Sequence, residues 1–308
     1  MRWGTAVGPS AGALVLLGAL GAPQAAGQPA ANAVRVHSLS PGDTVYVLLD
    51  GGGHSLAVVD EDRGGVVLVD TKSAGWGRTI ADAVSLVTEL PVTTIINTHA
   101  HGDNAGGNGE FPSTTRLIAH ENAHARMMRS ASSAEAGQSA TTFRDTLSLF
   151  EGANRIELYH FGRAHTDGDT VVVFPDKGVA HVGDLINGKA APVIDPAGGG
   201  SGVAYPETLA RLVAAIDGVD RVITGHGALP PVPGVHGMLQ TMTWADVEEY
   251  AAFTRDFLAA VREAMDAGKD AAEAAATLRL PERYAGYGME QAEANVRIIY
   301  DELLSSVP

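Results

Sequence analysis

The sequence predicts an α/β fold in which a mixed β-sheet is covered by helices. Short runs rich in valine, isoleucine and leucine recur between glycine-rich or charged turns, as in TVYVLLD at 44–50, which is typical of buried strands. Longer segments place apolar residues three and four positions apart, which is typical of amphipathic helices. Strands occur both in direct succession and interleaved with helices, so we expect antiparallel and parallel neighbours in the same protein.

Three consecutive strands come first after residue 34, and strands and helices alternate from there. The expected strands are 44–50, 56–60, 65–70, 92–98, 115–120, 156–162, 170–175, 178–184 and 220–227. The expected helices are 76–90, 121–130, 206–217, 243–267 and 289–304. No repeat and no linker interrupts these elements. Residues 34–308 are therefore expected to form a single domain that ends in helices.

Composition limits the function classes. The chain has 308 residues, is 45% hydrophobic and carries a net charge of -15 at pH 7, which fits a globular protein with a sizeable core. The acidity argues against a nucleic-acid partner, because no basic cluster offsets it. The absence of cysteine excludes disulfides, thiol nucleophiles and thiolate metal sites. We expect a small-molecule substrate, and the composition leaves the oligomeric state open.

Residues 1–33 have the features of a signal peptide. Arg2 precedes an apolar run at 11–22, no acidic residue interrupts the segment, and Ala31 and Ala33 form an A-x-A cleavage pattern. The apolar run is too short to anchor the chain across a bilayer. We therefore expect an exported protein, periplasmic or secreted, with no stable membrane span after removal of the signal.

Histidines and aspartates follow the ends of four predicted strands. These residues are His99, His101, Asp103, His165, Asp184 and His226. Neutral imidazoles and carboxylates are the ligands that zinc accepts when thiolates are absent. Alternate residues of an extended segment point the same way, so His99 and His101 can bind one ion, and Asp103 can reach a second. The pattern predicts a metal site at one rim of the sheet.

Five motifs together resemble the metallo-β-lactamase-fold metallohydrolases over residues 42–228. The motifs are L-V-D-T at 68–71, H-A-H-G-D at 99–103, A-H-T at 164–166, G-D-L at 183–185 and G-H-G at 225–227. The resemblance implies a four-layer αβ/βα sandwich with two zinc ions at one edge of two sheets. It implies that His99, His101 and His165 hold the first ion, that Asp103 and His226 hold the second, and that Asp184 bridges them. It also places Asp70 behind the site.

Asn104 marks a departure from the pattern. Glyoxalase II-like members of the fold read H-x-H-x-D-H, and the last histidine binds the second metal, whereas this chain has Asn104 there. One subclass of lactamases also lacks that histidine but has cysteine in place of Asp184. The second site, formed here by Asp103, Asp184 and His226, is rich in oxygen ligands, so we expect it to bind zinc more weakly and to accept manganese or iron. Asn104 itself is a candidate for supporting hydrogen bonds or for substrate contact.

The expected activity is hydrolysis of an ester, thioester, lactone or β-lactam bond by a metal-bound hydroxide. Asp103 is the expected catalytic residue, because its carboxylate can orient the hydroxide and transfer its proton to the leaving group. Lys189 and His54 are candidates for substrate binding, since Lys189 could pair with a carboxylate and His54 lies in a glycine-rich turn that could face the site.

Two alternatives remain open. Persulfide-dioxygenase-like members of the fold bind one iron through residues that match His99, His165 and Asp184, and a weak second site would suit such an oxidoreductase. A binding module without catalytic activity would be favoured if ligands had been lost. Since Asn104 is the only departure from the ligand pattern, hydrolysis is the leading hypothesis.

Overall fold

The computed structural model describes residues 33–39, 44–130, 140–235 and 238–305. Almost all of the segment expected to be a signal peptide lies outside these residues, so export stays a prediction. None of the helices in the described part of the chain is long and apolar enough to cross a membrane.

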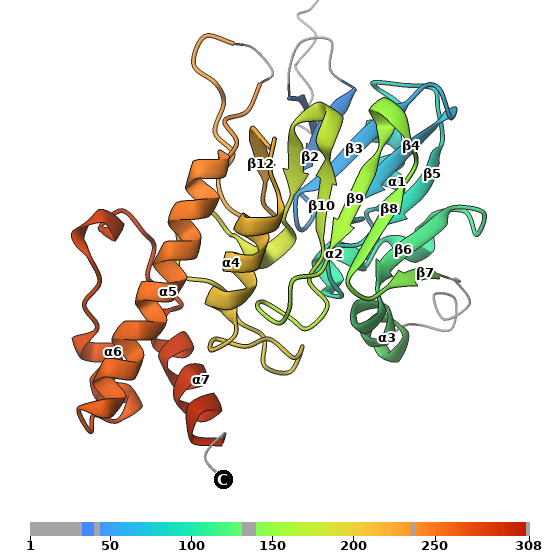
Figure 1. Ribbon diagram of the computed structural model, residues 1–308. Coiled ribbons are helices and arrows are strands. Elements are labelled where there is room, and N and C mark those ends of the chain that lie inside the picture. The colour runs from blue at the N-terminus through green and yellow to red at the C-terminus, as the bar shows by residue number, and fades with distance from the viewer. Residues whose placement is uncertain (1–32, 40–43, 131–139, 236–237, 306–308) are drawn as a thin grey trace, which may run out of the picture. The chain divides into compact units, whose positions relative to one another are not determined.

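The first sheet has seven strands in the order β1-β2-β3-β4-β5-β6-β7 (Figure 1). Neighbours are antiparallel from β1 to β4 and parallel from β4 to β7. The strands are β1 Arg35–Ser38, β2 Val45–Leu49, β3 Ser55–Asp60, β4 Gly65–Val69, β5 Val92–Ile96, β6 Arg116–His120 and β7 Ala140–Phe143. Parallel neighbours place the ends of β4, β5 and β6 at the same edge.

The second sheet has five strands in the order β12-β11-β10-β9-β8. Its neighbours are antiparallel except for β11 and β12, which are parallel. The strands are β8 Thr146–Leu149, β9 Ile156–Tyr159, β10 Val171–Phe174, β11 Val179–His181 and β12 Arg221–Ile223. The chain leaves β11 and β12 at the same edge, so the residues that follow them lie close together.

Seven α-helices accompany the sheets in the described part of the chain. They are α1 Gly77–Val84, α2 Gly102–Ala105, α3 Glu121–Ser130, α4 Tyr205–Ala215, α5 Trp244–Asp266, α6 Ala271–Thr277 and α7 Ala292–Ser305. The longest, α5, begins with a capping box in which Thr243 and Asp246 satisfy each other's backbone N–H groups.

Three apolar clusters hold these elements in four layers. One cluster joins the inner faces of the two sheets, with Val47 of β2 and Val172 of β10 among its members. A second packs α1 through Ile80 against the outer face of the first sheet. The third packs α4 and α5 against the outer face of the second sheet, where Leu209 and Phe253 are fully buried. The expected αβ/βα sandwich is confirmed.

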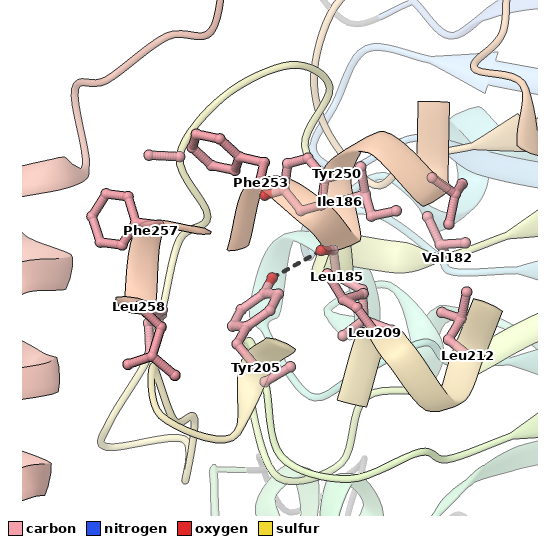
Figure 2. Packing of buried hydrophobic residues seen from close by; sticks show 14 of the residues in the cluster. Val182, Leu185, Ile186, Tyr205, Leu209, Leu212, Tyr250, Phe253, Phe257 and Leu258 are labelled. Carbon is pink, nitrogen blue, oxygen red and sulfur yellow. Dashed lines mark hydrogen bonds between the residues drawn. The ribbon is translucent and has the colours of Figure 1, made fainter. Parts of the chain in front are cut away.

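The third cluster also supports the loop that carries Asp184. Figure 2 shows the hydroxyl of Tyr205, at the start of α4, donating a hydrogen bond to the carbonyl of Leu185 at 2.9 Å. Tyr205 is fully buried among apolar side chains, where an unpaired hydroxyl would be costly. This bond ties the packed helical layer to the residue that follows Asp184.

The element boundaries differ from expectation where the chain enters loops. Strands expected at 92–98, 178–184 and 220–227 end at Ile96, His181 and Ile223, because the residues beyond turn toward one edge of the sheets. The helix expected at 76–90 ends at Val84. The short strands β1, β7 and β8 were not expected; polar residues interrupt or flank their apolar ones (RVHS, ATTF and TLSL), so none of them contains an apolar run.

Candidate metal centre

The structure brings all six predicted ligands together. His99 and His101 follow β5, Asp103 lies in α2, and His165 lies between β9 and β10. Asp184 is part of the 3-10 turn Gly183–Leu185, and His226 follows β12. Contrary to expectation, Asp103 does not continue an extended segment from His99 and His101. His101 is the last extended residue and caps α2, so Asp103 faces its partners from the first turn of a helix.

His99, His101 and His165, here called the histidine cluster, converge on one point. One ring nitrogen from each lies within 4.8 Å of the others. The three rings meet edge to face, with centroids 4.7 to 4.8 Å apart. The Nε2 atom of His165 lies 3.0 Å from Nδ1 of His101. Three imidazole nitrogens that face one another at this spacing are suited to holding a metal ion.

The other nitrogen of each ring is held by the protein. Nδ1 of His99 bonds the hydroxyl of Thr98 at 3.0 Å, and Nδ1 of His165 donates to the carbonyl of Val193 at 2.8 Å. Nε2 of His101 donates to the carboxylate of Asp195 at 2.9 Å. Such bonds fix the tautomer and the ring orientation, so the remaining nitrogen of each ring points into the cluster.

Asp103, Asp184 and His226, here called the mixed cluster, lie beside the histidine cluster. Nε2 of His226 is 3.0 Å from Oδ2 of Asp103 and 3.5 Å from Oδ2 of Asp184. The hydrogen bond between His226 and Asp103 raises the pKa of the imidazole and lowers the pKa of the carboxyl. The same Asp184 oxygen lies 4.0 Å from Nε2 of His99 and 3.8 Å from Nε2 of His165. Asp184 therefore stands between the two clusters.

Two buried atoms without partners test whether the site fits a metal. Nε2 of His99 and Oδ1 of Asp184 are both buried and have no hydrogen-bond partner among the described residues. Burial also lowers the pKa of His99 well below its usual range and raises that of Asp184. Buried polar atoms are rarely left unpaired. A divalent cation coordinated by imidazole nitrogens and carboxylate oxygens would satisfy both atoms, so the residues fit a metal centre.

Asp70 supports the histidine cluster indirectly, through hydrogen bonds to Thr98. Its carboxylate accepts bonds from the backbone N–H and the hydroxyl of Thr98, at 2.8 and 2.7 Å. Because that hydroxyl donates to Asp70, it accepts from Nδ1 of His99. Burial raises the pKa of Asp70 to about 7, although hydrogen bonds from Asn104 and Thr98 oppose this shift.

Asn104 completes the environment of Asp70. Its side chain is fully buried, and its amide donates to Oδ2 of Asp70 at 2.9 Å. This is a supporting hydrogen bond of the kind expected for Asn104. Substrate contact by Asn104 stays a prediction, and the complete burial of the side chain does not favour it.

A buried lysine holds the turn between β2 and β3 beside the mixed cluster. Lys72 is fully buried, and its Nζ donates to the carbonyls of Leu48 and Gly53, both at 2.8 Å. Burial lowers the pKa of Lys72 to about 7. The N–H of Gly53 in turn donates to the carbonyl of Asp103 at 2.9 Å. The turn is thus fixed at both ends and joined to a mixed-cluster residue.

His54 lies in this turn, next to the loop that carries His226. Its backbone N–H donates to the carbonyl of Gly225 at 2.7 Å, and Nδ1 donates to the carbonyl of Thr224 at 2.9 Å. Burial lowers the pKa of His54 to about 4, so the ring is neutral at pH 7. His54 is therefore near the site, as its turn suggested, and its contact with substrate stays a prediction.

Gly225 is required by the close approach of Asp184. A Cβ atom at position 225 would lie 1.9 Å from Oδ1 of Asp184. No side chain can occupy that space, so the glycine before His226 allows the loop after β12 to pass against the carboxylate.

The ion pairs of Lys189 are with α5 and not with the predicted metal ligands. Its Nζ pairs with Asp246 at 3.2 Å and with Glu249 at 3.4 Å, both on α5. Pairing with a substrate carboxylate would have to compete with these two acids, and it stays a prediction.

Asp195 is a residue that sequence reasoning missed. It lies in a loop without strand or helix periodicity, and its role depends on its contact with His101, which is distant in sequence. The nearest signal was the glycine-rich stretch 196–202 that follows it.

Comparison with known proteins agrees with this geometry. The sequence profile of the Metallo-beta-lactamase superfamily matches residues 49–226. The subunit alpha of 2,4-dinitroanisole O-demethylase from Nocardioides sp. (strain JS1661) is 30% identical over 145 residues, which are 46% of this chain and 44% of that protein. The chain thus spans less than half the length of this curated relative.

Two solved structures share the fold. A metallo-beta-lactamase from Pontibacter korlensis aligns with a TM-score of 0.57 and 18% identity, covering 72% of this chain and 99% of that one. The DIM-1 metallo-beta-lactamase aligns with a TM-score of 0.57 and 16% identity, covering 73% of this chain and 98% of that one. At this identity the likeness concerns the fold.

Proposed function

The chain belongs to the metallo-beta-lactamase superfamily, and from this membership we propose that it is a zinc-dependent hydrolase of an ester, thioester, lactone or β-lactam bond. The observation that carries the proposal is the position of Asp184. Its Oδ2 atom lies within 4.0 Å of His99 and His165 and 3.5 Å from His226. Such a carboxylate suits a bridge between two ions, so two zinc ions are proposed.

A bound metal supplies Lewis acidity, which lowers the pKa of water from about 15.7 to about 7 and stabilises negative charge on the substrate oxygen. The chain itself supplies rigid ligands and a proton acceptor. Asp103 is half-exposed, and the hydrogen bond with His226 keeps its pKa below the usual range. The carboxylate of Asp103 is thus ionised at neutral pH and can take a proton from the attacking water and deliver it to the leaving group.

The ligand types of the two clusters favour unequal occupancy of the two metal positions. Two carboxylates and one imidazole form a harder ligand set than three imidazoles. We propose that the second position binds zinc less tightly and accepts manganese or iron.

A substrate panel tests the proposal. The purified chain is assayed with and without added zinc on nitrocefin, a lactone, a thioester and a phosphodiester. Zinc-dependent cleavage of at least one of the first three is expected, and the phosphodiester should be inert. If none of the first three is cleaved, and a simple ester such as 4-nitrophenyl acetate is not cleaved either, the proposal is overturned. Oxygen consumption by iron-loaded protein with a persulfide would instead favour the dioxygenase alternative.

A second candidate is cleavage of an electron-poor aryl ether. It is favoured by the 30% identity to the subunit of an enzyme named for demethylating 2,4-dinitroanisole. The match covers under half of either chain, so this activity needs its own assay. The same panel should include 2,4-dinitroanisole, and the absorbance of the released 2,4-dinitrophenolate measures its cleavage.

A further inference from the structure

A cavity of about 330 Å³ opens beside the histidine cluster. Its lining includes His101, Thr166, Asp195 and Gly198 from loops, together with Arg126 and Arg129 of α3. The side chain of His101 is 34% exposed, so the cavity borders a predicted metal ligand directly. Its volume is in the range of small-molecule sites.

One arginine in the cavity is fixed by the protein. Arg126 forms a bidentate pair with Asp167, at 2.8 and 2.6 Å, and donates to the carbonyl of Ala197 at 2.9 Å. These bonds join α3 to the loops that follow His165 and Asp195. Arg126 therefore shapes the wall of the cavity, and its charge is already matched.

The other arginine, Arg129, has no partner among the residues that the structure describes. Arg129 is exposed, and no hydrogen bond or ion pair holds it among the described residues. It lies three residues after Arg126, so both arginines project from the same face of α3. The carboxylate of Asp195, the acid in the cavity, already accepts from His101 at 2.9 Å. The charge left unmatched in this cavity is therefore a guanidinium.

We propose that Arg129 recognises an anionic group, of the carboxylate class, on the substrate of the neighbouring metal centre. A guanidinium binds a carboxylate through two parallel hydrogen bonds, which fixes orientation as well as position. The net charge of -15 repels anions from the protein as a whole, so a free cation beside the site offsets that repulsion locally. The inference rests on the proposed hydrolytic function and specifies the substrate class.

Two matched esters test the role of Arg129 in turnover. They are 4-nitrophenyl acetate and its ring-carboxylated analogue 5-acetoxy-2-nitrobenzoate. Arg129→Ala should raise KM about tenfold for the carboxylated ester, the loss expected for a hydrogen bond to a charged group, and leave KM for the neutral ester unchanged. Arg262→Ala, which removes an exposed arginine on α5, should affect neither. Equal effects on both esters would overturn the inference.

A binding measurement separates this inference from the proposed function. Calorimetric titration of the metal-free chain with terephthalate should detect binding to wild type and to Arg262→Ala, and weaker binding by about tenfold to Arg129→Ala. Absent binding to wild type, or equal binding to Arg129→Ala, would overturn the inference whether or not any ester is cleaved. Terephthalate binding without turnover of either ester would count against hydrolysis while supporting the anion site.

Discussion

The histidine cluster and the mixed cluster are neighbours, but the protein holds them differently. In the histidine cluster, His99 and His165 are each 1% exposed, and every ring has its outer nitrogen bonded to the protein. In the mixed cluster, Asp103 is 43% and His226 is 38% exposed. Within the described residues, no hydrogen bond holds Nδ1 of His226.

The protein itself therefore organises the three histidines, whereas Asp103 and His226 are held mainly by their own ion pair. Ligands fixed by outer hydrogen bonds bind metal more tightly than ligands that must be ordered on binding. The histidine cluster is therefore the expected anchor, whereas Asp103 and His226 are the ligands more exposed to solvent.

The largest expected effect comes from Asp103→Ala. Loss of the proposed proton acceptor should lower kcat/KM about 100- to 10,000-fold. Because the histidine cluster is independently held, metal content should fall by one ion and not by two. Both quantities are measured on the same preparation, with Asp217→Ala as an exposed-carboxylate control. Full activity of Asp103→Ala would contradict the mechanism, and loss of both ions would contradict the independence of the clusters.

Asp195→Ala tests the anchoring of the histidine cluster. Removing the acceptor that orients His101 should weaken binding of the first ion about 10- to 100-fold, as measured by competition with a chromophoric chelator. Asp195→Asn keeps an oxygen that can accept from Nε2 of His101, so its affinity should lie between those of Asp195→Ala and wild type. Unchanged affinity in Asp195→Ala would show that the ring is held by packing alone.

Stepwise chelation compares the two clusters directly. As chelator is added to the zinc-loaded wild type, one ion should leave at a chelator concentration about tenfold lower than the other, in keeping with the effect of outer hydrogen bonds. In Asp103→Ala the early phase should be missing. Simultaneous loss of both ions in wild type would mean that the clusters do not differ in affinity.

The smallest expected effect is on the pH dependence of stability in the metal-free protein. The raised pKa of His226 contributes stability below the ordinary value of 6.5, which is lost as pH rises through the raised pKa. The lowered pKa of Asp103 contributes stability above the ordinary value of 3.8, which is lost as pH falls through the lowered pKa. The full contribution is thus present between pH 3.8 and 6.5.

Chemical denaturation of wild type and Asp103→Asn across pH measures this contribution. Since both side chains are more than a third exposed, the difference in unfolding free energy should not exceed about 1 kcal/mol. It should shrink as pH rises above the raised pKa of His226. A difference that grows at alkaline pH would show that the pair does not stabilise the fold.

Sequence reasoning reached the ligands because each follows a recognisable strand. His99, Asp184 and His226 each come three residues after the end of β5, β11 or β12, and His165 lies in the loop after β9. The layered fold was predictable for a related reason, since buried strands such as β4 and β10 are rich in valine. The short edge strands β1, β7 and β8 gave no comparable signal.

The residues that support the ligands were harder to predict. Asp195 orients His101 and Thr98 orients His99 through side-chain hydrogen bonds, and nothing local distinguishes the two residues from other loop residues. Lys72 is fully buried, against the strong tendency of lysine to be exposed. Its position follows from two carbonyls supplied by β2 and the turn after it, which only the folded chain brings together.

The two carbonyls bound by Lys72 also mark fixed attachment points for loop engineering. Nζ of Lys72 donates to the carbonyl of Leu48 in β2 and to that of Gly53 just before β3. One side chain therefore holds both ends of the span between them.

Within this span Asp50 is the only exposed residue that carries a side chain, because the leucine before it is buried in the core and the two glycines after it have no room for one. A Cβ atom at Gly51 would lie 2.3 Å from the ring of Trp76, and one at Gly52 would lie 2.4 Å from the backbone oxygen of Asp103. Engineering of this turn would thus have to start from Asp50, since a side chain at Gly52 would displace a predicted metal ligand.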